Sequence, residues 1–74
     1  MMEREISKDG DVLLTLGDVE GSAGERGTAV QWHAWCSRCM WSTGLAVPAP
    51  TLEKAEAAAV AAMNGHKCLG GVGG

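Results

Sequence analysis

The sequence predicts a small α+β fold in which an N-terminal β-hairpin or strand precedes a ββα unit. Three observations support this prediction. Before residue 36, apolar and polar residues alternate over two stretches, as they do in strands with one buried face. After residue 50, an alanine-rich stretch has the composition of a helix. Two cysteines lie between these regions, and a histidine and a third cysteine follow them, so that one shared site would join the two regions.

The N-terminal region, residues 1–27, is predicted to contain an acidic hairpin or strand and a mobile glycine-rich loop. Asp9-Gly10 is a suitable hairpin turn, because glycine tolerates positive φ, and it separates a weak strand from a clearer one over residues 12–16. Residues 17–27 contain four glycines and many polar side chains. This composition is typical of a loop, and we expect its acidic residues on a solvated surface.

The strongest strand signal covers residues 28–35. Alternation places Trp32 on the same side of this strand as Cys36, so we expect Trp32 in the core. Trp35 and His33 lie on the opposite side. Two arrangements of Trp35 are compatible with this pattern: it is exposed together with His33, or it packs under the N-terminal hairpin.

Residues 40–45 are expected to return as the second strand of a hairpin, and a Pro-Ala-Pro sequence then interrupts the pattern. A helix is predicted over residues 52–64, with Thr51 as its N-cap and Gly65 as a residue that can end it. Small side chains let such a helix lie close to a sheet. The stripe that should face the sheet consists of Leu52, Ala55, Ala59 and Met63.

Cysteine and histidine spacing predicts a metal site. Cys36 and Cys39 are separated by two residues, and His66 and Cys68 follow the predicted helix. The two-residue gap allows a tight turn that points both sulfurs at one ion, and zinc prefers four thiolate and imidazole ligands in a closed tetrahedron. A chain of 74 residues buries little apolar area and usually needs a staple. We therefore predict one structural zinc ion that staples a ββα-type finger.

Three other interpretations of the cysteines fit the sequence less well than zinc. A redox Cys-x2-Cys pair normally opens a helix in an α/β fold, whereas this pair interrupts a β-like run. A disulfide would leave one of three cysteines over, and unrelated buried thiols would leave the C-terminal histidine unexplained. The tight His-x-Cys spacing is unusual, so His33, three residues before Cys36, is the alternative ligand.

Residues 32–68 resemble the small zinc-finger proteins common in actinobacteria and their phages. The pattern in that family is a tryptophan-flanked Cys-x2-Cys, an alanine-rich helix, then histidine and cysteine. The resemblance implies a ββα-type finger and no particular activity. DNA-reading fingers differ, because they end in two histidines and carry basic helix residues. The residues that match the pattern are Cys36, Cys39, Trp41, His66 and Cys68.

The predicted organisation is the acidic region over residues 1–27, a zinc-binding ββα domain over 28–68 and a flexible glycine-rich tail over 69–74. The first residues lack the basic and apolar regions of a signal peptide. No apolar run approaches the roughly 20 residues that span a bilayer. We expect a soluble protein without a membrane partner in the cytoplasm, or in the host cytoplasm if a phage encodes it.

Charge and composition favour a protein partner. The net charge is −3, with a net −4 in residues 1–26 and no basic face of the kind that duplex binding needs. Tryptophan and methionine are dense around the cysteine pair, and both are enriched in interface cores. We expect a zinc-stabilised protein-interaction or regulatory module without a small-molecule substrate. The residues expected to bind the partner are His33, Trp35, Arg38 and Met40.

The alternative function is nucleic-acid binding by Arg38 and Lys67, with base stacking on Trp35 or Trp41. An enzyme is not expected. Four protein ligands leave zinc no open position, and the sequence shows no second cluster of acid and base residues.

Overall fold

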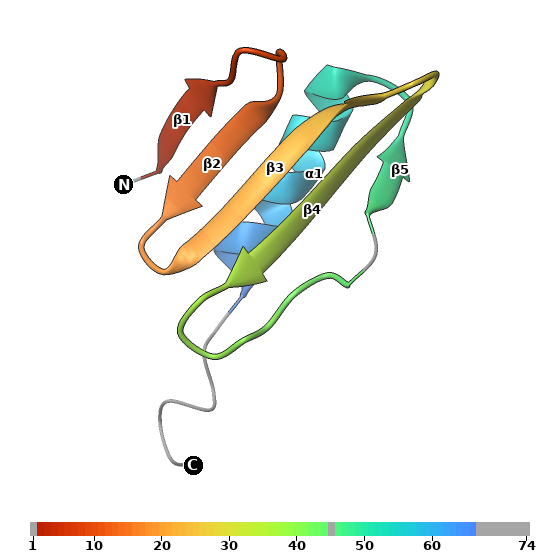
Figure 1. Cartoon of the computed structure of the whole chain (residues 1–74). Helices are drawn as coiled ribbons and strands as arrows, with labels where there is room; N and C mark the ends of the chain where they lie inside the picture. Colours follow the sequence, from red (N-terminus) through yellow and green to blue (C-terminus); the bar gives the residue numbers. More distant parts are fainter. Residues whose placement is uncertain (1, 45, 67–74) are drawn as a thin grey trace.

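Alternating apolar residues and an alanine-rich segment form one antiparallel sheet with a helix on one face in the computed structural model, which describes residues 2–44 and 46–66 (Figure 1). The five strands follow one another across the sheet in chain order. The predicted α+β class, with N-terminal strands before a ββα unit, is confirmed. The elements are β1 (Glu3–Ile6), β2 (Val12–Leu16), β3 (Val19–Arg26), β4 (Ala29–Cys36), β5 (Val47–Ala49) and α1 (Leu52–Gly65).

Two-residue turns that begin with glycine join the three central strands. Gly17-Asp18 connects β2 to β3, and Gly27-Thr28 connects β3 to β4. Gly17 has a φ of 62° and Gly27 a φ of 67°. Tight hairpins need this left-handed conformation at their first turn residue, and glycine adopts it without strain.

Strand β3 lies where the sequence predicted a mobile loop over residues 17–27, so that prediction was wrong. β3 is the central strand and pairs along its whole length with β4. Its glycine, serine, alanine and glutamate residues have low strand propensity. The small residues have a packing role instead: a Cβ at Gly21 would lie 2.8 Å from Sδ of Met63 on the helix. Glycine therefore lets the helix approach the sheet.

The chain after the cysteine pair also departs from the prediction. The strand predicted over residues 40–45 is reduced to a single bridge between Ser42 and Trp35 among the residues that the structure describes. The outer strand is β5, whose central residue is Pro48. Proline fits there because β5 is an edge strand, where one missing N–H group does not break a ladder on both sides.

The helix follows the prediction closely. The Thr51 side chain accepts a hydrogen bond from the Lys54 N–H group at 3.1 Å, as an N-cap should, and the helix ends at Gly65.

Trp32 is partly buried and packs against the core. The buried residues between helix and sheet are Val12, Leu14, Val19, Ala23, Ala34, Cys36, Ala55, Ala59 and Met63.

The predicted regions share one sheet. The boundary predicted at residue 27 falls in the turn between β3 and β4. β3 pairs directly with the strand that leads to the cysteines, and β1 and β2 continue the same sheet. Arg4 on β1 also bonds to Glu56 on α1, with its Nε 2.6 Å from Oε2. The tail predicted over residues 69–74 lies outside the described residues.

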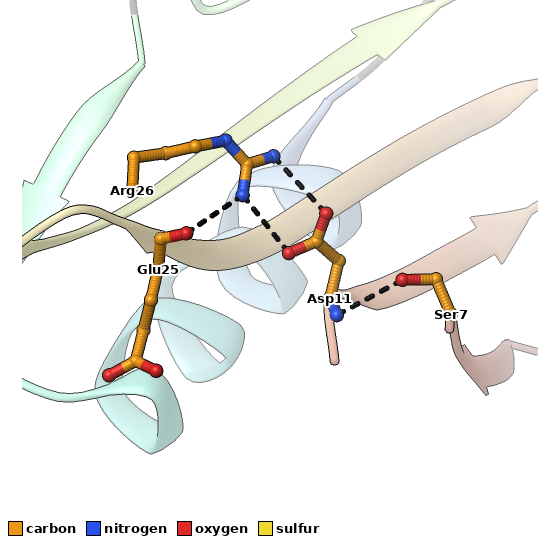
Figure 2. A network of polar contacts seen from close by, with 4 residues as sticks. All are labelled: Ser7, Asp11, Glu25 and Arg26. Carbon is orange, nitrogen blue, oxygen red and sulfur yellow. Dashed lines mark hydrogen bonds and ion pairs between the residues drawn. The ribbon is translucent and has the colours of Figure 1, made fainter. Parts of the chain in front are cut away.

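The end of the sheet far from the cysteines is held by exposed polar contacts (Figure 2). The Asp11 carboxylate accepts hydrogen bonds from Nη1 of Arg26 at 3.0 Å and from Nη2 at 3.2 Å. The Asp11 N–H group donates to Oγ of Ser7, and Arg26 Nη1 also donates to the carbonyl of Glu25. The hydrogen bond from Arg26 to Asp11, and then the charge of that carboxylate, raise the pKa of the guanidinium above its usual value. These contacts tie the β1–β2 turn to the β3–β4 turn.

Candidate metal centre

The turn after β4 holds Cys36 and Cys39 close together. The Met40 N–H group donates to the Cys36 carbonyl at 3.0 Å, and the Cys36 N–H group donates to the Trp41 carbonyl at 2.7 Å. Met40 has a φ of 64°, which is uncommon for a residue with a side chain. Cys36 is buried at the end of the strand, and Cys39 is partly buried in the turn.

His66 reaches the same place from the end of the helix. The residue is extended, with φ of −78° and ψ of 137°, and its N–H group donates to the Met63 carbonyl at 3.3 Å. The chain therefore leaves the helix at Gly65. Trp41 stacks on the imidazole, with ring centroids 4.2 Å apart and planes at 17°. This stack restricts the orientation of the histidine ring.

The ligand atoms of the two cysteines and His66 form one group. Sγ of Cys39 lies 3.2 Å from Nε2 of His66, and the ligand atoms of Cys36, Cys39 and His66 all lie within 4.8 Å of one another. A sulfur and a nitrogen that share a tetrahedral zinc ion are roughly 3.6 Å apart, and two sulfurs are about 3.8 Å apart. The three side chains are therefore close enough to bind one metal ion.

The remaining predicted ligand, Cys68, lies outside the described residues, two positions beyond His66 in the sequence. The alternative ligand His33 does not belong to the group. It lies on the other face of β4 from Cys36 and stacks on Trp35, with ring centroids 4.6 Å apart. Of the two histidines, His66 is therefore the one that lies beside the cysteines.

The predicted partner-binding residues occupy two neighbouring surfaces. His33 and Trp35 are partly buried on the sheet face opposite the helix. Arg38 and Met40 are exposed in the turn over residues 36–41, and Met40 is 84% exposed. The N-terminal hairpin lies beside β3 in the sheet, so it does not form a layer over Trp35.

Sequence reasoning missed two features near this site. The stack of Trp41 on His66 depends on two segments that are distant in the chain. Glu20, the neighbour of Trp35 across the sheet, was placed in a loop. A signal for strand β3 does exist, because the glycine-led pairs Gly17-Asp18 and Gly27-Thr28 enclose eight residues, a suitable length for a strand with a tight turn at each end.

In the part of the chain that the structure describes, the helix is too short and insufficiently apolar to cross a bilayer. No protein-family model, curated protein or solved structure matches the chain.

Proposed function

We propose that the protein is a small protein-interaction module whose fold is stabilised by one structural zinc ion. The observation that carries this proposal is the grouping of Cys36, Cys39 and His66, which brings the turn after β4 to the end of the helix. Cys68 is the fourth ligand in this proposal. Thiolate and imidazole donors favour zinc over the cations that prefer oxygen. Four protein ligands leave no position for a reactive water, which supports a structural role rather than an enzymatic one.

The composition of the core explains why a metal would matter. Among residues 2–44 and 46–66, four of the nine buried core residues are alanines, namely Ala23, Ala34, Ala55 and Ala59. Each alanine removes little apolar surface from water, so this core contributes less hydrophobic stabilisation than one of leucine and phenylalanine. A metal that joins the end of β4 to the end of α1 would add folding energy to a domain whose core contributes little hydrophobic stabilisation.

The distribution of basic side chains favours a protein partner over a nucleic acid. Among the residues that the structure describes, Arg4 is paired with Glu56 and Arg26 with Asp11. Those two guanidinium groups are already neutralised, and no basic stripe follows any strand or the helix. Binding to phosphates needs such a stripe. Trp35, which is partly exposed and directly precedes Cys36, instead suits a protein interface.

The metal part of the proposal is tested by measuring zinc and fold together. Native mass spectrometry is expected to show one zinc ion per chain. Replacing zinc with cobalt should give the visible absorption of a tetrahedral thiolate site, and Cys68→Ser should change that spectrum. A chelator should abolish the near-ultraviolet circular dichroism of the tryptophans. A metal-free chain that keeps its fold would contradict the structural role.

The interaction part needs a separate measurement. The immobilised zinc-loaded chain is expected to retain specific proteins from a cell lysate, and the chelated chain is expected to lose them. Mass spectrometry of the retained fraction identifies these proteins. A zinc-loaded chain that retains nothing beyond the bare resin would argue against an interaction module.

A further inference from the structure

The sheet face opposite the helix carries no covering layer among residues 2–44 and 46–66 (Figure 1). Strand register places two rows of side chains across it. One row contains Glu5, Leu13, Ser22 and His33. The other row contains Glu3, Thr15, Glu20, Trp35 and Ser42. We call this surface the open face.

The open face combines acidic and apolar groups. Glu3, Glu5 and Glu20 have no ion-pair partner among the described residues. Leu13 is 39% exposed. Trp35 is partly buried and is held by its stack with His33. Leu13 on β2 and Trp35 on β4 thus share a surface with three carboxylates, one of which, Glu20 on β3, is the cross-strand neighbour of Trp35.

Neither Arg4 nor Arg26 neutralises this surface. The Arg4 side chain turns to the helix side of the sheet, where it bonds to Glu56. Arg26 shares the open face but is paired with Asp11 at the far end of the strands. The rows that contain Trp35 and His33 therefore have a net negative charge.

We propose that the open face docks a basic segment of a partner protein, one in which arginine or lysine alternates with apolar side chains. This inference rests on the proposed interaction function and specifies the chemistry of the partner. Arginine can bond to carboxylates through two N–H groups and can stack on the face of a tryptophan. Apolar side chains of the same segment would cover Leu13 and Trp35. Because its stack with His33 already orders Trp35, little side-chain freedom is lost on docking.

Charge also favours a basic segment over the other possible occupants of the open face. A second copy of the chain, docked face to face, would bring two sets of carboxylates together. A nucleic acid would place phosphates against Glu3, Glu5 and Glu20. A basic segment is the occupant that this surface attracts rather than repels.

The test uses the full zinc-loaded chain and a synthetic peptide that alternates arginine with leucine. A peptide of equal length that alternates glutamate with leucine is the control. In a titration followed by NMR, the arginine peptide should shift the amide signals of β1 to β4 and the indole signal of Trp35. The amides on the outer side of α1 should stay in place, and the glutamate peptide should cause no shifts.

Variants measure separately how much the carboxylates and Trp35 contribute to the affinity for the peptide. Glu3→Gln, Glu5→Gln and Glu20→Gln in one chain should weaken peptide binding about tenfold, and Trp35→Ala should do so by a similar factor. Glu53→Gln, at the exposed start of the helix, is the matched control and should leave the affinity unchanged. Circular dichroism confirms that each variant is folded before its affinity is compared.

Several outcomes would overturn the inference. They are peptide shifts confined to the helix, equal affinity of the triple variant and the wild type, self-association through the open face, and binding of a single-stranded DNA probe there. The lysate experiment distinguishes a failure of this inference from a failure of the proposed function. If the wild type and the triple variant retain the same proteins, the docking surface is wrong and the interaction function stands. If the zinc-loaded chain retains no protein, the interaction function itself fails.

Discussion

The two ends of the sheet are held together by different chemistry. At one end, Cys36, Cys39 and His66 bring ligand atoms from two distant segments within 4.8 Å. At the other end, Asp11 and Arg26 form an exposed ion pair between two turns (Figure 2). Structural zinc adds on the order of 10 kcal/mol to folding in small domains, whereas solvent screens an exposed ion pair almost completely. With the proposed zinc ion bound, stability should therefore be concentrated at the cysteine end, and mutations can test that asymmetry.

The largest effect is expected from Cys39→Ser. With zinc bound, losing one thiolate should remove most of the roughly 10 kcal/mol of metal-linked folding energy and unfold the domain. Circular dichroism and zinc stoichiometry on the same sample measure both consequences. Ser37→Ala, in the same turn, is the control and should keep both properties. A folded, zinc-free Cys39→Ser chain would show that zinc does not make the cysteine end the more stable end of the sheet.

A pair of histidine substitutions sharpens the assignment of the ligands. His66→Ala should lose zinc and destabilise the fold by several kcal/mol, because His66 lies 3.2 Å from the Cys39 sulfur. His33→Ala removes a side chain from the opposite face of the sheet and should keep zinc, with a stability loss within about 1 kcal/mol. Metal content and thermal melting of both variants give the answer. The reverse pattern would make His33 the ligand.

An intermediate effect is expected in the middle of the sheet, from Gly21→Ala. The added methyl group would lie 2.8 Å from the Met63 sulfur, so the buried Met63 side chain would have to shift. Overpacking of this kind costs about 1–3 kcal/mol, measured by denaturant unfolding of the zinc-loaded chain. Gly65→Ala is the control, since a Cβ there meets no atom within 4 Å. Equal stability of the two variants would mean that the helix docks without close contact at Gly21.

The smallest effect is expected at the far end, from Asp11→Asn. The substitution removes the charge that pairs with Arg26, and the Tm should fall by a few degrees at most because the pair is exposed. The difference should shrink further at high salt, where screening weakens the wild-type pair. Melting curves at low and high salt test this. A loss comparable to that of Cys39→Ser would remove the proposed asymmetry.

Local sequence signals were sufficient for the helix and for the cysteine turn. Thr51 as N-cap, the apolar stripe and the end at Gly65 all depend on neighbours within a few positions. The Cys-x2-Cys spacing likewise predicts a turn with two adjacent thiols. Such features can be read from the sequence because residues close in the chain are necessarily close in space.

Only the tertiary structure revealed strand β3 and showed which histidine lies beside the cysteines. Many residues of β3 have low strand propensity, and the glycine at position 21 is explained by the Met63 side chain that packs against it. His33 is nearer to Cys36 in the sequence, but the helix brings His66 to Cys39 across 27 positions. Local propensity carries no information about which distant side chain will fill a space. That information arises only when the helix packs on the sheet.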